Sequence, residues 1–204
     1  MIGLIDRCVY RFTWSLIKLF DKIFFHIEFQ GRENLPRQGG YILACNHLSY
    51  IDPVIMSQAQ YRPVTFLARD TLFKHKIFGF YISRLGAIAI KREASDFRAL
   101  RATLKRLAQG SPVVLFPEGT RLGDDKNAQP GIGFLAIKSK VPVIPAYIQG
   151  SDKVLPPGAK WFHRHPIKVS LGKSIHFKDG KDYAEIAGDI MDTIRSLAPQ
   201  GNFS

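Results

Sequence analysis

The first residues with chemical potential are a histidine and an aspartate five positions apart, His47 and Asp52. A regular helix would separate them by about 140° around its axis, too far for a hydrogen bond, and Pro53 disfavours helical geometry at Asp52. A turn between them would instead bring the carboxylate to one imidazole nitrogen. The carboxylate would then fix the tautomer and stabilise the imidazolium, as for a general base. On the spacing alone, a surface histidine near a helix cap is the commoner outcome.

The sequence offers no clear protein nucleophile for such a base. Cys45 precedes His47 by two residues at the end of an apolar run, so strand alternation allows a cysteine–histidine pair. A cysteine in that position is more often part of an apolar core. Ser49 is too close to His47 and lacks a nucleophile-elbow context. A base that acts on a substrate hydroxyl is the simpler interpretation, with a Cys45/His47 hydrolase of lipids or thioesters as the alternative.

Three apolar runs end directly before polar clusters, and these runs are the elements that must position the chemistry. The runs and their clusters are Tyr41–Cys45 before Asn46-His47, Ala87–Ile90 before Lys91-Arg92, and Val113–Phe116 before Pro117-Glu118-Gly119-Thr120-Arg121. If the three strands are parallel, the clusters share one rim of the sheet, where open α/β sheets bind ligands. Arginines there suit phosphate, and a glycine lets the backbone approach a ligand closely.

The alternation of short apolar runs with helical stretches predicts an α/β fold: a single mixed or mostly parallel sheet flanked by helices. The further predicted strands are Phe24–Phe29 first, Val141–Ile148, and Ile167–Leu171 as a late edge strand. Ser95 and Asp96 can cap a helix that ends at Gly110, and a last helix is predicted from about Asp182.

Residues 2–25 are apolar with a thin basic stripe. Helical spacing aligns the polar residues Arg7, Arg11, Ser15, Lys18 and Lys22. A broad apolar face under such a stripe predicts a helix that lies in the membrane interface, although a helix that caps the core would share the pattern. We therefore predict two parts: residues 1–24 as an amphipathic, membrane-associating helical segment, and residues 25–204 as a catalytic domain.

Composition narrows the class of protein. The 204 residues suffice for a buried core, and 46% hydrophobic with 23% charged residues indicates a folded chain. Two cysteines exclude a disulfide framework, and no Cys/His cluster has zinc spacing. No uncharged run reaches the roughly 18 apolar residues of a spanning helix.

The charge of +12 indicates anionic partners. Basic residues are mixed with aromatic residues in residues 60–92, where Asp70 is the one acid. Nucleic-acid-binding proteins use the same mixture, but no nucleic-acid-binding signature accompanies it. We therefore predict anionic lipid as the partner and no nucleic acid.

The sequence resembles the lysophosphatidic acid acyltransferase (1-acylglycerol-3-phosphate O-acyltransferase) family of the glycerolipid acyltransferases. The resemblance rests on four blocks in order, within a similarity that runs from about residue 24 to 175. They are Asn46-His-Leu-Ser-Tyr-Ile-Asp52, matching NHxxxxD, then Gly86-Ala-Ile-Ala-Ile-Lys-Arg92, Phe116-Pro-Glu-Gly-Thr-Arg121 and Val141-Pro-Val-Ile-Pro145.

The resemblance implies transfer of a fatty acyl group from a thioester, either acyl-CoA or acyl carrier protein, to a lysophospholipid hydroxyl. His47 would be the base, oriented by Asp52, and the hydroxyl would attack without an acyl-enzyme. The implied substrate-binding residues are Asn46, Arg92 on the acceptor phosphate, Glu118, Gly119, Thr120 and Arg121. No metal or other cofactor is implied.

The resemblance also implies a peripheral or monotopic protein at the cytoplasmic face of the inner or plasma membrane, with the bilayer, lysophosphatidate and the acyl donor as partners. The implied product is phosphatidic acid, although relatives with the same blocks acylate other lysolipids. Many relatives carry a lysine where this chain has Gln129. Lys126 and Lys138 are both open as replacements.

Overall fold

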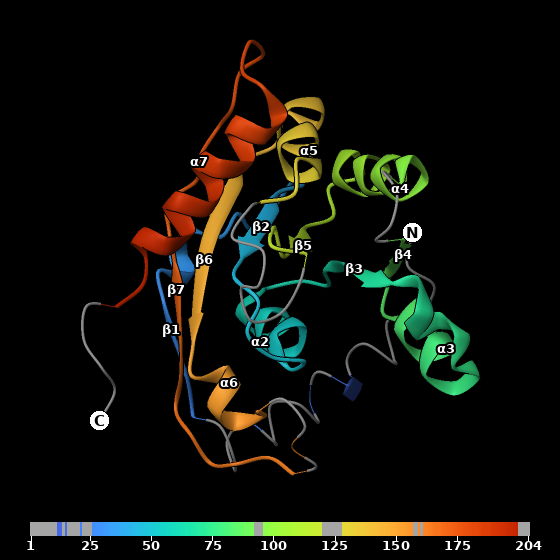
Figure 1. The fold of residues 1–204 in the computed structure, drawn as a ribbon, viewed down its shortest axis with the longest axis vertical. Helices are drawn as coiled ribbons and strands as arrows, with labels where there is room; N and C mark the ends of the chain where they lie inside the picture. The colour runs from blue at the N-terminus through green and yellow to red at the C-terminus, as the bar shows by residue number, and fades with distance from the viewer. Residues whose placement is uncertain are drawn as a thin grey trace.

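The computed structural model describes residues 12–13, 15, 21, 26–91, 96–119, 128–156, 159 and 161–199. Seven strands form one sheet in the order β1-β7-β6-β2-β5-β3-β4 (Figure 1). Their bounds are β1 Ile27–Gln30, β2 Ile42–Cys45, β3 Thr65–Arg69, β4 Ile88–Ile90, β5 Val113–Leu115, β6 Val143–Gln149 and β7 Ile167–Leu171. The α-helices are α2 Asp52–Ala59, α3 Lys76–Arg84, α4 Phe97–Ala108, α5 Gly131–Ser139, α6 Ser151–Val154 and α7 Tyr183–Ser196, with 3-10 turns η1 Arg32–Asn34 and η2 Asp70–Lys74.

The sheet is mixed, as predicted. β6, β2, β5, β3 and β4 run parallel to their neighbours, whereas β7 is antiparallel to β6 and β1 is parallel to β7. The prediction of Ile167–Leu171 as an edge strand is wrong, because β1 covers the outer side of β7. A strand that the sequence analysis missed, β3, lies between β5 and β4.

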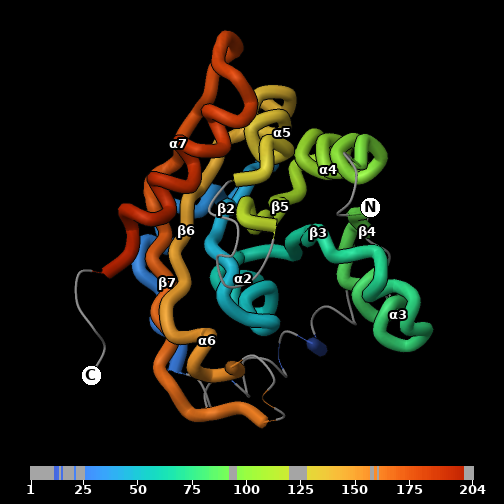
Figure 2. Tube along the Cα trace, viewed as in Figure 1, coloured from blue at the N-terminus to red at the C-terminus, as the bar shows by residue number. Residues whose placement is uncertain are grey.

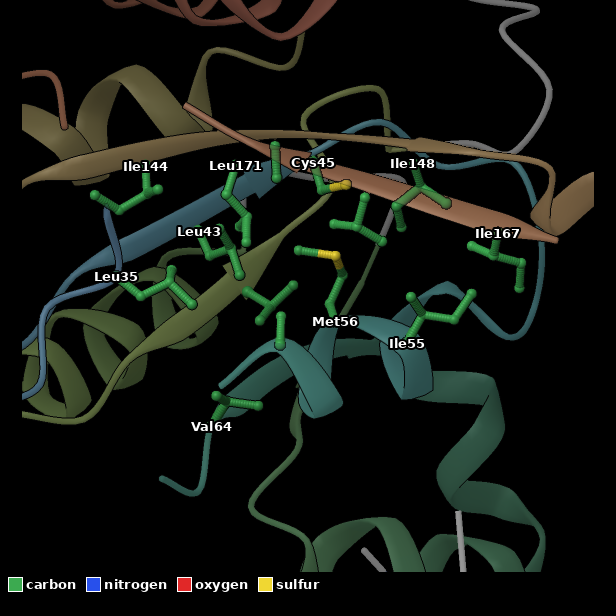
Figure 3. Packing of buried hydrophobic residues seen from close by; sticks show 14 of the residues in the cluster. Leu35, Leu43, Cys45, Ile55, Met56, Val64, Ile144, Ile148, Ile167 and Leu171 are labelled. Atoms are coloured by element: carbon green, nitrogen blue, oxygen red, sulfur yellow. The ribbon is translucent and has the colours of Figure 1, made fainter. Parts of the chain in front are cut away.

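Helices cover both faces of the sheet. α2 packs on one face, where Ile55 and Met56 point toward Leu43, Cys45 and Ile148 (Figure 3). α4, α5 and α7 lie on the other face (Figure 1). α5 and α7 approach closely at Gly133, where a Cβ would collide with the Tyr183 carbonyl. The sheet is therefore fixed between two apolar layers, and its rim is held in place for a site.

Two of the predicted helices begin as the sequence indicates. The Asp96 carboxylate accepts hydrogen bonds from the backbone N–H groups of Arg98 and Ala99 at the start of α4. Asp182 accepts from the N–H of Ala184 at the start of α7. These side chains satisfy backbone donors that the first helical turn leaves without partners.

The N-terminal amphipathic segment is mostly outside the described residues. Arg7, Arg11, Lys18 and Lys22 are among the residues not described, so the membrane-docking prediction for residues 1–24 stays a prediction. Of this segment, Phe12, Thr13, Ser15 and Asp21 are helical. Within the described ranges, no helix combines the length and apolar character needed to span a bilayer.

Candidate active site

The predicted clusters share one rim of the sheet. β2 pairs parallel with β5, β5 with β3, and β3 with β4, so their carboxyl ends point the same way. The residues after β2 and β5 are described as far as Gly119. Arg92, Thr120 and Arg121, which we predicted as substrate-binding, lie outside the described residues.

His47 and Asp52 are in direct contact. The distance between His47 Nδ1 and Asp52 Oδ2 is 2.8 Å. The same oxygen accepts the backbone N–H groups of Leu48 at 2.7 Å and Ser49 at 2.8 Å. The predicted turn therefore exists, and three donors converge on one carboxylate oxygen.

The helix geometry at Asp52 differs from the expectation. α2 begins at Asp52 itself, with Pro53 in its first turn. Proline is tolerated there because the first-turn N–H groups have no intrahelical partner to lose. The start of α2 thus rigidly places Asp52, which is fully buried, beneath the 16% exposed side chain of His47.

This geometry defines the protonation pattern of the histidine. Because an ionised carboxylate only accepts, neutral His47 donates from Nδ1 and keeps Nε2 as an acceptor. The second carboxylate oxygen of Asp52, Oδ1, is buried and has no hydrogen-bond partner among the described residues. The arrangement is that of a histidine base with an orienting carboxylate.

Phe116 and Glu118, which follow β5, both contact the histidine segment. The Phe116 ring stacks on the His47 imidazole with 4.3 Å between ring centroids and 25° between planes. Burial raises the pKa of Glu118, and a hydrogen bond from the His47 backbone N–H and the charges of His47 and Arg195 partly offset this. The sequence analysis named Phe116 only as part of the Phe116–Arg121 motif and gave it no role. No local pattern indicates that its ring lies over the imidazole of His47.

Asn46 joins the histidine segment to the neighbouring strand. Its side-chain Nδ2 donates to the Ile148 carbonyl at 2.9 Å, and its Oδ1 accepts the Ile148 N–H at 2.7 Å. The side chain is buried, with 4% exposed. We predicted Asn46 as substrate-binding. That role stays a prediction. The two bonds use the Asn46 amide to continue the β2–β6 pairing one residue before His47, and so help to position the histidine segment.

A family model described as Acyltransferase matches residues 26–149, which include β1 through β6 and both members of the His47–Asp52 pair. The chain belongs to this acyltransferase family.

Several relatives of this acyltransferase are named 1-acyl-sn-glycerol-3-phosphate acyltransferases. It is 26% identical over 173 residues to a 1-acyl-sn-glycerol-3-phosphate acyltransferase of Bacillus subtilis, covering 84% of both chains. It is 29% identical to one of Streptococcus pneumoniae, covering 86% of this chain and 66% of that protein. A third relative is the chloroplastic 1-acyl-sn-glycerol-3-phosphate acyltransferase BAT2 of Brassica napus, at 29% identity. The chain spans 53% of the length of that longer protein.

A solved structure shares the fold of this acyltransferase. The crystal structure of the 1-acyl-sn-glycerophosphate (LPA) acyltransferase PlsC from Thermotoga maritima superposes with a TM-score of 0.69. The match covers 96% of this chain and 81% of that chain at 22% identity. The single mixed sheet with flanking helices is therefore the architecture of that protein too.

Cys45 is not placed as a nucleophile in this acyltransferase. Its side chain is fully buried in the core cluster against α2 (Figure 3), and its thiol lies 3.4 Å from Asn46 Oδ1. Burial raises the pKa of Cys45 well above its ordinary value, and the charges of Asp52 and Glu118 add to the effect. Because the thiolate is the nucleophilic form, this environment opposes the hydrolase alternative.

Gln129, where the resemblance implies a lysine, lies beside the site. Its backbone N–H donates to the Pro117 carbonyl at 2.9 Å, and a Cβ at Gly119 would lie 3.2 Å from its Cγ. Gly119 has φ of 64°, which favours glycine. Lys138 lies exposed in the last turn of α5, and Lys126 is outside the described residues. In the part of the chain that the structure describes, no three His, Cys, Asp or Glu side chains cluster as a metal site.

Proposed function

We propose that this acyltransferase transfers a fatty acyl group from an acyl thioester to the free sn-2 hydroxyl of 1-acylglycerol-3-phosphate, forming phosphatidic acid. The observation that carries the proposal is the 2.8 Å contact between His47 and Asp52 at the carboxyl end of β2. The choice of 1-acylglycerol-3-phosphate as acceptor follows the names of the relatives.

The transfer proceeds by direct attack. His47 Nε2 takes the proton of the acceptor hydroxyl while the hydroxyl oxygen bonds to the thioester carbonyl carbon. The carbon–sulfur bond then breaks, and the imidazolium returns the proton to the leaving thiolate. Asp52 holds the tautomer and stabilises the imidazolium. General-base assistance of this kind contributes ~10²–10⁴-fold, and alignment of the two substrates adds an orientation term.

The acceptor phosphate binds at the rim of the sheet beyond β4 and β5. Arg92 and Arg121 are the proposed phosphate ligands, because guanidinium groups bind phosphate oxygens in pairs. Glu118, Gly119 and Thr120 line the acceptor site beside them. The overall charge of +12 attracts both anionic substrates, the lysolipid and either acyl-CoA or acyl carrier protein. The chemistry requires no metal or organic cofactor.

Both lipid substrates are amphiphiles, so the proposed site works at a membrane. Residues 1–24 are the proposed membrane-associating segment, with their basic stripe toward anionic headgroups. The cytoplasmic face of the inner or plasma membrane, where anionic lipid and acyl donors meet, is the proposed location.

The test is acyl transfer from palmitoyl-CoA to 1-acylglycerol-3-phosphate in mixed micelles. Wild type should form phosphatidic acid, and His47→Ala should lose at least about 100-fold in kcat. His176→Ala is the matched control, because His176 is exposed in the segment after β7, and this variant should retain activity. Equal rates for wild type and His47→Ala, with both folded by circular dichroism, would contradict the proposal.

The same assay identifies the acyl donor and tests the two alternative functions, another lysophospholipid as acceptor and a Cys45/His47 hydrolase. Acyl carrier protein replaces palmitoyl-CoA in one series, and lysophospholipids with other headgroups replace the acceptor in another. Cys45→Ala reports on the hydrolase alternative: direct transfer predicts little loss of activity, whereas a cysteine nucleophile predicts its abolition.

A further inference from the structure

α3 carries its large apolar side chains on the side that faces away from the protein. Of its nine residues only Gly79 is buried. Ile77 is 89% exposed and Phe80 is 63% exposed, followed by Phe78 at 47% and Tyr81 at 37%. At 100° per residue, Ile77 and Tyr81 lie about 160° and 200° around the helix from Gly79. The most exposed side chains of α3 are thus apolar, whereas a surface helix usually turns its apolar side chains toward the core.

The packing under α3 explains this orientation. A Cβ at Gly79 would meet the Phe73 backbone carbonyl at 2.5 Å, so a glycine is required where α3 rests on η2. η2 follows directly after β3, whose carboxyl end lies on the rim that carries His47. Figure 2 shows the chain passing from β3 through α3 to β4 at the end of the sheet. α3 is therefore held at the site end of the molecule with its apolar face outward.

Cations surround this apolar face. Residues 71–91 contain Lys74, Lys76, Arg84 and Lys91 and no acidic residue. The Arg84 guanidinium lies 4.8 Å from the centroid of the exposed Phe80 ring. An open depression of about 730 Å³ lies between the basic and apolar side chains of residues 75–78 and Tyr81.

The surface extends to the N-terminal segment. The Tyr81 hydroxyl hydrogen-bonds Thr13 Oγ1 at 2.8 Å, and the adjacent Phe12 is 72% exposed. The segment that contains Phe12 and Thr13 therefore lies next to Tyr81 of α3. Soluble monomers rarely expose such a contiguous apolar patch unless it binds something.

We propose that α3 is a bilayer-docking helix, with Ile77, Phe78, Phe80 and Tyr81 entering the acyl region and Lys74 and Lys76 contacting anionic headgroups. We define these six residues as the α3 face. The charge of the protein favours a lipid bilayer over a second copy of the chain as the partner of this face. Two copies, each with a net charge of +12, would repel each other, whereas an anionic lipid surface attracts the cations around the face. Docking here places the rim of the sheet against the source of the lipid acceptor. The proposal concerns binding alone and does not depend on the proposed reaction.

The test is a flotation assay that measures partitioning of the full chain onto lipid vesicles. One set of vesicles is pure phosphatidylcholine, and the other contains about 30 mol% of the anionic lipid phosphatidylglycerol. The double variant Ile77→Glu/Phe80→Glu should lower the partition coefficient on anionic vesicles at least about tenfold. Lys74→Glu/Lys76→Glu should weaken the preference for anionic vesicles. Phe97→Glu is the matched control, because Phe97 is 68% exposed on α4, and it should bind as wild type.

The outcomes separate this proposal from its alternatives. Wild-type partitioning by the Ile77→Glu/Phe80→Glu variant overturns it, since both substitutions are at exposed positions that the fold does not need. A concentration-dependent dimer in sedimentation that this variant abolishes, without vesicle binding by wild type, assigns the face to a second copy instead. Acyl transfer in mixed micelles is measured separately, so a failed reaction with retained flotation refutes the proposed function and leaves the docking surface standing.

Discussion

Replacing Asp52 by asparagine removes a charge from the site while nearly preserving the side-chain shape. In wild type the carboxylate oxygen is 2.8 Å from His47 Nδ1. With an effective dielectric constant of about 20 and the imidazolium charge spread over both ring nitrogens, this pair stabilises the protonated histidine by about 4–6 kcal/mol. Each ~1.4 kcal/mol is a factor of ten in rate, so kcat/KM should fall about 10³- to 10⁴-fold.

The assay is initial-rate acyl transfer in mixed micelles, with secondary structure checked by circular dichroism. The asparagine carbonyl can still accept the backbone N–H groups of Leu48 and Ser49, so Asp52→Asn should fold. Asp182→Asn is the control, because Asp182 caps α7 at the other end of the sheet (Figure 1). A folded Asp52→Asn variant with less than a tenfold loss would refute the role of the carboxylate as electrostatic partner of the base.

Three further variants test positioning and charge. Asn46→Asp replaces the donor that faces the Ile148 carbonyl with an acceptor in a buried position, so the free energy of unfolding in urea should fall by about 2–4 kcal/mol. Because burial raises the pKa of Glu118, its charged form destabilises the fold. Glu118→Gln should therefore raise Tm at pH 7, and the gain should disappear as the pH falls below 4.5, where the carboxyl is protonated in both folded and unfolded chains. Hydrogen bonds from the backbone N–H groups of Ala99, Lys91 and Arg98 lower the pKa of Asp96. Asp96→Ala should then cost about 1 kcal/mol at neutral pH, and urea melts should show this cost shrinking as the pH falls below 3.8.

The histidine–aspartate contact could be anticipated because only six residues of chain run from His47 to Asp52, so a turn between them can bring the carboxylate to the ring. The spacing alone did not decide for this contact, whereas the match to the NHxxxxD block of the acyltransferase family did. The shared rim was predictable for a similar reason: buried strands that end at polar clusters are expected to be parallel in an α/β fold. The capping aspartates of α4 and α7 follow from preferences that act within one turn.

What the sequence could not supply are contacts across the fold. Asn46 and Ile148 are 102 residues apart, and no local pattern marks the amide as a strand partner. β3 was missed because its apolar run is short and lies within residues 60–92, the basic and aromatic stretch that we assigned to lipid binding. Strand β7 has the alternating burial of a strand with one face on the core, a pattern that edge and inner strands share, and pairing with β1 places it inside the sheet.

The direction of β1 has a consequence for how an anchor would act. Because β1 is antiparallel to β6, the chain enters β1 at the rim where β2 and β5 end. At the start of β1, the Ile27 N–H donates to the Asp21 carboxylate at 3.1 Å. A segment that binds a bilayer ahead of β1 would hold His47, the proposed base, close to the membrane surface that contains the lipid substrate. Encounter would then become a two-dimensional search, in which turnover follows the mole fraction of lysolipid in the bilayer and not its bulk concentration.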